Sequence, residues 1–166
     1  PHHVGSPGSR EVAEFIAAPD ASEVVFTKNS SEALKLVANV LAWGPRGLQP
    51  GDEVVITEME HHSNIVPWQL LCERTGATLR WFGVTDEGRL DLSNADALIN
   101  ERTKVLSLTH VSNVLGTVNP VAELAARAHA VGALVVVDGS QAVPHMPVVV
   151  AALGVDFYAF TGHKMC

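Results

Sequence analysis

The chain has 166 residues, the length of one domain and enough to bury a core without disulfides or metals. Its formal net charge is −7, and no basic stripe is present to meet phosphates, which argues against a nucleic-acid-binding protein. No apolar run reaches the length that crosses a bilayer, and no signal-peptide pattern is expected at the N-terminus. The two cysteines are too few for a disulfide framework, so we expect a reducing, cytoplasmic setting.

Residues 1–9 are rich in proline, glycine, serine and histidine, and we interpret them as an N-terminal arm or tag-like linker. Residues 10–166 form the predicted domain, in which strand-like and helix-like apolar patterns alternate. The expected helices span residues 11–17, 30–41, 63–75, 91–100 and 121–131. The expected strands span residues 23–27, 53–57, 79–84, 104–109, 133–137 and 155–160.

This alternation predicts an α/β fold with a mostly parallel sheet and helices on both faces, a three-layer α/β/α arrangement. The continuous apolar run at residues 133–137 is typical of a strand buried on both sides. In such sheets, ligands bind beyond the carboxyl ends of the strands. The residues that follow each expected strand are therefore the candidate binding residues.

Two of these strand ends suit a ligand that carries a phosphate and an aromatic ring. Ser30 and Ser31 open a helix, where N–H groups and hydroxyls bind phosphate, although a capped helix alone has the same sequence. His61 and His62 follow the strand at residues 53–57; one ring could lie against an aromatic ligand, or both could lie on the surface.

Three more strand ends carry single polar residues with two interpretations each. Asn113 is a ligand or a turn former. Asp138 ends an apolar strand, where a carboxylate needs a positive or donating partner and could alternatively bind Mg²⁺. Lys164 follows a glycine and a hydroxyl and is a candidate Schiff-base former, although a lone lysine there usually faces solvent.

Taken together, these residues indicate pyridoxal 5′-phosphate (PLP). This cofactor needs a lysine for its aldehyde, an acid for its ring nitrogen, donors for its phosphate and a group that packs on its ring. Four groups meet these needs in turn: Lys164, Asp138, the hydroxyls of Ser30 and Ser31 after Asn29, and His61. A Mg²⁺ site would leave Lys164, His61 and Gln141 unexplained.

From about residue 23 onward, the sequence resembles the class V aminotransferase-like, fold-type I PLP enzymes, most closely the SufS/CsdA-type cysteine desulfurases and selenocysteine lyases. The resemblance rests on four blocks in the family's order: residues 59–68, 109–116, 137–145 and 161–164. The family usually has Thr-Thr or Ala-Thr at Ser30-Ser31 and Ser at Thr161, and both differences keep a hydroxyl.

The resemblance implies a role for each site residue. Lys164 would form the Schiff base and move protons at the substrate Cα, and His61 would stack on the ring and act in acid–base steps. Asp138 would pair with the ring nitrogen, Gln141 would hydrogen-bond the ring oxygen, and Asn113 would lie near the cofactor and the substrate carboxylate. The phosphate contacts would come from Ser30, Ser31, Thr161 and His163. No metal is expected.

The family reaction removes sulfur from L-cysteine, giving L-alanine and an enzyme persulfide for iron–sulfur cluster assembly. The resemblance also implies a homodimer and a sulfur-acceptor protein, with neither nucleic acid nor membrane as a partner. The family's nucleophilic cysteine and carboxylate-binding arginine lie well downstream of the lysine, and neither Cys72 nor Cys166 matches the nucleophile. We therefore interpret the chain as an incomplete PLP-binding large domain.

Three hypotheses remain open from the sequence. The first is a cysteine desulfurase. The second is other chemistry on the same scaffold, by a selenocysteine lyase, a kynureninase-like enzyme or an epimerase. The third is a piece without turnover, which would expose apolar surface where the rest of the enzyme packs.

Overall fold

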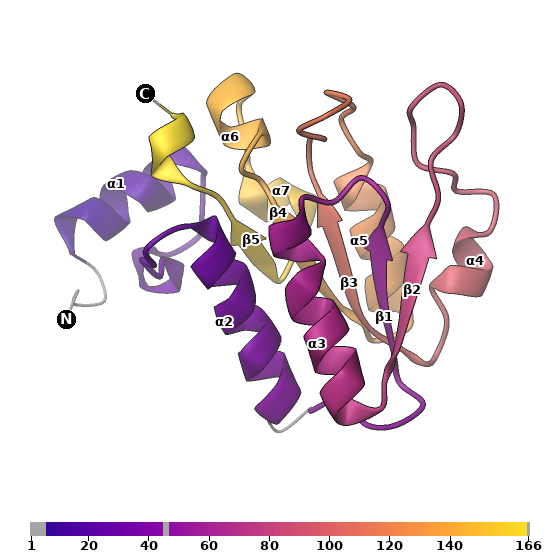
Figure 1. The fold of residues 1–166 in the computed structure, drawn as a ribbon. Helices are drawn as coiled ribbons and strands as arrows, with labels where there is room; N and C mark the ends of the chain where they lie inside the picture. The colour runs from indigo at the N-terminus through magenta and orange to yellow at the C-terminus, as the bar shows by residue number, and fades with distance from the viewer. Residues whose placement is uncertain (1–5, 45–46, 166) are drawn as a thin grey trace.

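The computed structural model describes residues 6–44 and 47–165. Within them, five parallel strands form one sheet in the order β2–β1–β3–β4–β5, with helices on both faces (Figure 1). The strands are β1 (Glu53–Thr57), β2 (Thr78–Phe82), β3 (Thr103–Thr109), β4 (Leu134–Asp138) and β5 (Phe157–Ala159). The predicted three-layer α/β/α fold is confirmed.

The helical segments connect these strands and lead into the sheet. The α-helices are α1 (Pro7–Phe15), α2 (Ser30–Trp43), α3 (Val66–Thr75), α4 (Ala95–Leu98), α5 (Val121–Ala130), α6 (Ala142–His145) and α7 (Val150–Leu153). Short 3₁₀ turns are η1 (Ala21–Glu23), η2 (His62–Asn64) and η3 (Gly162–Lys164). None of the helices in this described part is long and apolar enough to cross a membrane.

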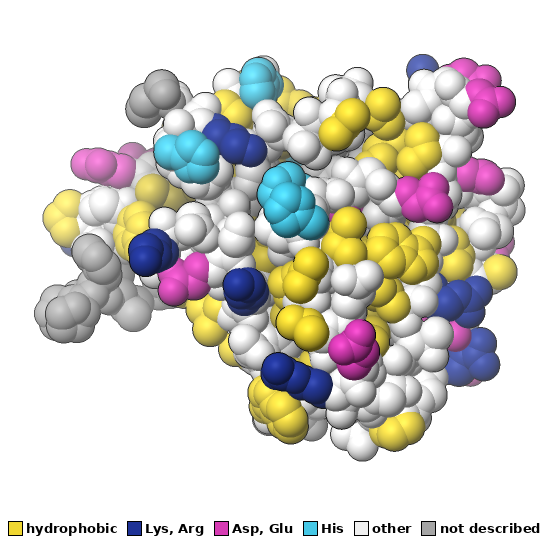
Figure 2. All heavy atoms as spheres, in the orientation of Figure 1, with side chains coloured by type: hydrophobic (Ala, Val, Ile, Leu, Met, Phe, Trp, Pro, Cys, Tyr) yellow, Lys and Arg dark blue, Asp and Glu magenta, His cyan; other side chains and the backbone are white. Residues whose placement is uncertain are grey.

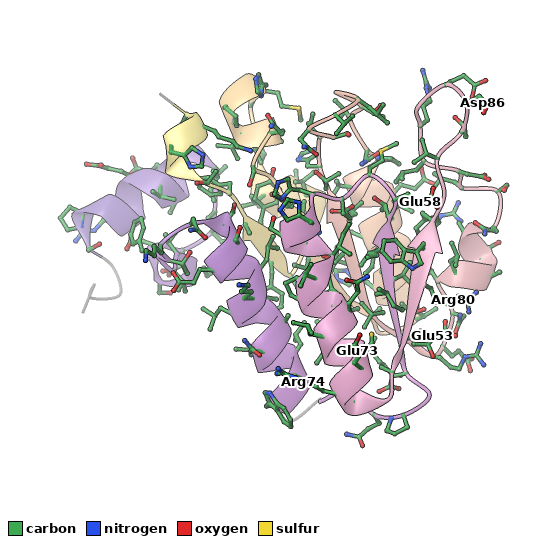
Figure 3. The ribbon with its side chains drawn as sticks, in the orientation of Figure 1. Glu53, Glu58, Glu73, Arg74, Arg80 and Asp86 are labelled. Carbon is green, nitrogen blue, oxygen red and sulfur yellow. The ribbon has the colours of Figure 1, made fainter. Side chains whose placement is uncertain are left out.

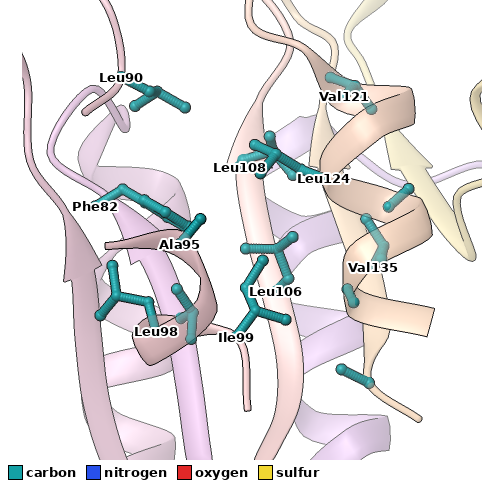
Figure 4. Close-up of a cluster of buried hydrophobic side chains, with 14 of the residues drawn as sticks. Phe82, Leu90, Ala95, Leu98, Ile99, Leu106, Leu108, Val121, Leu124 and Val135 are labelled. Carbon is teal, nitrogen blue, oxygen red and sulfur yellow. The ribbon is translucent and has the colours of Figure 1, made fainter. Parts of the chain in front are cut away.

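The sheet is buried on both faces by two apolar clusters. On one face, α4 and α5 pack against the strands, with Phe82, Leu106 and Leu124 fully buried between them (Figure 4). On the other face, α2 and α3 bury Leu34 and Trp68 against the opposite sides of the same strands. Burial on both sides explains why the strands read as apolar runs rather than as alternating patterns.

Segment 23–27 was expected to be a strand, and that prediction is wrong. Glu23 ends η1, and residues 24–27 belong to no strand of the described sheet. Val25 is 69% exposed and Phe26 is 45% exposed, because no neighbouring strand covers them. Together with α1, α2 and β5 they line an apolar groove of about 1230 Å³.

Two helix predictions also differ from the structure. The first helix begins at Pro7, inside the segment expected to be a linker, because Ser6 caps it by accepting a hydrogen bond from the Ser9 amide at 3.2 Å. Residues 1–5 lie outside the described residues, and the domain boundary at residue 10 stays a prediction. The helix expected at 91–100 shrinks to α4, since Asp91 accepts from the Ser93 amide and forms a local turn instead.

Candidate functional site

The carboxyl ends of the strands surround a small polar pocket of about 280 Å³. Parallel strands bring their carboxyl ends to one edge of the sheet, so segments far apart in sequence meet there. In Figure 2, histidine side chains gather along this upper part of the molecule. The pocket is lined by Asn29, Ser30, Ser31, His61, Ser63, Thr109, Asn113, Asp138, Ser140, Gln141, Thr161, His163 and Lys164.

All nine side chains predicted from the sequence to form a site line this one pocket. They come from segments that follow β1, β3, β4 and β5 and from the start of α2. The structure therefore brings the predicted residues together; the role of each residue stays a prediction.

Asp138 lines the pocket at the end of β4 and is only 5% exposed. Its Oδ1 accepts a hydrogen bond from the Ser140 amide at 3.0 Å. No described residue donates to its Oδ2. The hydroxyl of Ser140 is also buried and lacks a partner among the described residues. A buried polar atom normally has a partner, so both atoms are suited to a ligand.

Gly139, next to Asp138, is required by a close approach of β5. A Cβ added at Gly139 would lie 2.1 Å from the ring of Tyr158, well inside van der Waals contact. The Tyr158 hydroxyl lies 2.9 Å from His110 Nδ1, and burial raises the pKa of Tyr158. This packing behind the pocket fixes the turn that carries Asp138 and Ser140.

Lys164 lies on η3, directly after β5. It is exposed and forms no hydrogen bond or ion pair with the described residues. In the same turn, Thr161 Oγ1 lies 2.8 Å from His163 Nδ1. The lysine amine is thus available at the pocket, beside a hydroxyl and an imidazole that are already oriented by each other.

The start of α2 supplies a site for an anion. Asn29 caps the helix by accepting from the Glu32 amide at 2.9 Å. Ser30 and Ser31 follow and line the pocket with their neighbouring backbone N–H groups. α2 has 14 residues, so its dipole adds to the attraction for a negative group at this end.

His61 lies in the turn between β1 and α3. The Ser63 amide donates to its Nδ1 at 3.3 Å, so the proton of the neutral ring resides on Nε2. Its ring stacks on that of His62, with centroids 4.1 Å apart. Burial, then the neighbouring His62, lower the pKa of His61; Lys164 acts in the same direction and Asp138 opposes it. His61 is therefore largely neutral at pH 7.

Asn113 and Gln141 complete the predicted set. Asn113 lies exposed in the loop closed by the bridge between Val111 and Val118. Gln141 is the N-cap residue of α6; its backbone carbonyl lies 2.6 Å from His145 Nδ1, and the residue lines the pocket. Both positions are at the rim rather than in the core.

Sequence reasoning missed two features of the site. Ser140 follows Asp138 closely, but that its hydroxyl lacks a partner emerges only from the packing. Glu60, one residue before His61, is buried behind the pocket, which no sequence signal indicated. No group of three or more His, Cys, Asp or Glu side chains that could hold a metal occurs within residues 6–44 and 47–165.

These donors and acceptors fit the chemistry of PLP. A phosphate matches the N–H groups and hydroxyls of the α2 start and of η3. A protonated ring nitrogen matches the free oxygen of Asp138, and an aldehyde matches the exposed amine of Lys164. The unsatisfied hydroxyl of Ser140 adds a polar contact that only a ligand or a water would use.

The chain belongs to the aminotransferase class-V family, whose family model matches residues 8–166. Two of its relatives are named as cysteine desulfurases. It is 65% identical over 162 residues to a probable cysteine desulfurase of Streptomyces coelicolor, covering 96% of this chain and 39% of the relative. It is 55% identical over 155 residues to a cysteine desulfurase of Dickeya dadantii, covering 93% of this chain and 37% of the relative.

The fold agrees with solved structures of the same kind. The cysteine desulfurase CsdA of Escherichia coli matches with a TM-score of 0.89 at 37% identity, over 94% of this chain and 39% of that one. A C-DES mutant with glycine covalently linked to its PLP cofactor matches with a TM-score of 0.81 at 28% identity, over 95% of this chain and 41% of that one. PLP is the cofactor of this family, and the predicted resemblance is confirmed. The chain spans about two-fifths of the length of these relatives.

Proposed function

We propose that the protein containing this chain is a PLP-dependent cysteine desulfurase and that this chain forms its cofactor-binding site. One observation carries the proposal: the nine side chains that the sequence singles out line a single pocket at the carboxyl edge of the sheet. The names of the relatives support the choice of cysteine as the substrate.

We assign the binding roles from the donors and acceptors of the pocket. Asp138 holds the ring nitrogen in its protonated form through the free oxygen, and Gln141 donates to the ring oxygen. The phosphate is held by Ser30, Ser31, Thr161 and His163. When bound, PLP supplies a ring that accepts electrons from the substrate Cα.

Three further side chains act on the substrate side of the ring. Lys164 anchors the cofactor and moves a proton at the substrate Cα, for which its exposed amine is suited. His61 packs on the ring, and its lowered pKa keeps it neutral and able to accept a proton. Asn113 orients the substrate carboxylate from the rim of the pocket.

The persulfide would form on a cysteine outside this chain. Cys72 is buried in α3, and burial raises the pKa of its thiol to about 11, so it is neither exposed nor ionised at pH 7. We propose that the complete protein gives L-alanine and passes sulfur from that cysteine to an acceptor protein. Iron–sulfur cluster assembly, a SufS-like homodimer and a cytoplasmic location belong to the same proposal.

The experiment compares the full-length protein with its Lys164→Ala variant. We expect the wild type to be yellow with bound PLP and to release alanine from L-cysteine. Lys164→Ala should lose alanine release by on the order of 1,000-fold or more, because it loses both the anchor and the proton carrier. Lys35→Ala, which removes an exposed lysine on the body of α2, is the matched control and should behave as the wild type.

Two results would contradict the proposal. A full-length protein that binds PLP but releases no alanine from cysteine would favour the alternatives on the same scaffold: selenocysteine lyase, kynureninase-like or epimerase chemistry. Alanine release by the isolated 166-residue chain would refute the idea that residues outside it complete the reaction.

A further inference from the structure

Glu60 is a buried acid with no place in the roles assigned above. It lies between β1 and η2, one residue before His61, and is 8% exposed. Its Oε1 accepts from Thr57 Oγ1 at 2.6 Å and from the Thr109 amide at 2.8 Å. Its Oε2 accepts from Asn64 Nδ2 at 2.7 Å. One carboxylate therefore joins the end of β1, the end of β3 and the turn that carries His61.

The turn is closed twice by Asn64. The backbone N–H of Asn64 donates to the His61 carbonyl at 2.7 Å, and the Asn64 side chain donates to Glu60 Oε2. The Asn64 side chain is fully buried, and its Oδ1 accepts from Trp68 Nε1 at 3.0 Å and from Ser107 Oγ at 2.8 Å. His61 thus stands on a short loop whose two sides are bound to β3 through Glu60 and Asn64.

The hydrogen bonds in this network have a fixed direction. Trp68 Nε1 is a donor only, so Asn64 must present its oxygen to Trp68 and its NH₂ group to Glu60. The Thr109 N–H is also a donor only, so the other oxygen of Glu60 must accept as well. A side-chain amide at position 60 would place its NH₂ group against the Thr109 N–H in one orientation and against the Asn64 NH₂ group in the other.

We propose that Glu60 is a positioning residue that holds His61 at the cofactor pocket by anchoring its turn to β3. This inference rests on the proposed function only for the identity of the ligand. The geometry itself concerns residues of this chain. Asp138 is the other charged group that acts on Glu60, from β4 across the sheet, and desolvation raises the pKa of Glu60 to about 7 despite its three donors. A carboxyl group can remain in place in either protonation state, since a proton on Oε1 can point to Thr57 Oγ1.

The direction of the network supplies a matched rescue. Glu60→Gln creates the clash of two donors, whereas the double variant Glu60→Gln/Asn64→Asp removes it. The amide then donates to the new carboxylate, which still accepts from Trp68 and Ser107. Glu58→Gln makes the same chemical change at an exposed position two residues away and serves as the control.

The test measures two properties in the full-length protein. The first is the pKa of His61 in cofactor-free protein, from the ring resonances of labelled histidine, with the signal identified by its loss in His61→Gln. The second is the dissociation constant of PLP, from its visible absorbance. Glu60→Gln should raise the pKa of His61 toward 6.5, since the released turn loses the burial that lowers it. It should weaken PLP binding about tenfold, the scale of coupled neighbours.

The double variant should restore both values, and Glu58→Gln should change neither. The proposal is overturned if Glu60→Gln leaves both values at those of the wild type, or if the double variant remains as disturbed as Glu60→Gln. A Glu60→Gln protein that fails to fold leaves the decision to the double variant. If the wild type binds no PLP, the proposed function fails, and the pKa of His61 still decides the positioning role.

Discussion

Two buried acids at opposite ends of the sheet, Glu53 and Asp138, differ in how fully their oxygens are hydrogen-bonded. At the amino end, Glu53 contacts Arg80 at 3.2 Å and Arg102 at 3.1 Å through Oε1, while Oε2 accepts from Asn100 at 2.9 Å. In Figure 3, Glu53 and Arg80 lie close together at this end, and Glu58 marks the opposite end of β1. At the carboxyl end, Asp138 keeps one oxygen without a donor among the described residues, and Ser140 keeps a bare hydroxyl.

This difference separates an acid that is satisfied by the protein from an acid that is available to a ligand. Breaking the contacts of a satisfied acid such as Glu53 costs stability, because groups that were hydrogen-bonded at a buried position lose their partner. Unsatisfied groups such as Asp138 and Ser140 cost stability and persist where a ligand completes them. Variants of Asp138 and Ser140 should therefore affect binding more than folding.

The largest expected effect is at Asp138. Asp138→Asn removes the negative charge that would hold a protonated ring nitrogen, so we expect kcat/KM of the full-length protein to fall by on the order of 1,000-fold. Thermal unfolding should change little, because the lost oxygen has no donor to leave behind. A loss of stability as large as the loss of activity would contradict the contrast between the two ends.

The next effect is a pH dependence caused by Glu60. Its pKa rises from an ordinary 4.5 to about 7 in the folded state, so the folded protein holds a proton that the unfolded chain releases. The contribution of Glu60 to stability is therefore fully present below pH 4.5 and is lost as the pH rises to 7, by about 3 kcal/mol. Urea unfolding of cofactor-free protein at a series of pH values should show this fall in the free energy of unfolding.

The Glu60→Gln protein tests the origin of that pH dependence, because it has no titrating acid at this buried site. Its stability should vary less between pH 5 and 7 than that of the wild type. An equal slope in both proteins would assign the pH dependence to other groups.

A smaller effect is expected at the amino end. Glu53→Gln breaks two ion pairs and weakens a hydrogen bond at a buried position, so the free energy of unfolding should fall by about 2 kcal/mol. PLP affinity should remain that of the wild type, which absorbance titration checks. If Glu53→Gln weakened PLP binding and left the free energy of unfolding unchanged, the stabilising role of Glu53 would be contradicted.

The smallest effect is expected at Ser140. Ser140→Ala removes a buried hydroxyl that has no partner among the described residues, so cofactor-free protein should gain about 1 kcal/mol of stability. The same change should weaken PLP binding slightly. A destabilised cofactor-free protein would mean that the hydroxyl has a partner before the cofactor binds.

The sequence predicted the parts of the molecule that burial alone determines. β1 was predicted with its observed bounds, since all five of its residues are buried on both faces. Segment 23–27 has the same apolar character, yet it is no strand in the described sheet because strand formation also needs a neighbouring edge. Local turns around Asp91 likewise shortened a helix that periodicity favoured.

The candidate site was predictable to a similar extent. Parallel strands place their carboxyl ends together, so Asp138, Lys164 and His61 could be grouped from their positions after strands. The missing oxygen partner of Asp138 and the directed network at Glu60 could not be predicted, because they depend on which donors reach each oxygen in three dimensions.

Under the proposed function, the carboxyl end of the sheet holds PLP through Lys164. The most direct test is borohydride reduction of the full-length protein with bound PLP, followed by digestion and mass spectrometry of the peptides. We expect a pyridoxyl group on the peptide that contains Lys164, at that side chain. A pyridoxyl group on any other lysine, with Lys164 unmodified, would contradict it.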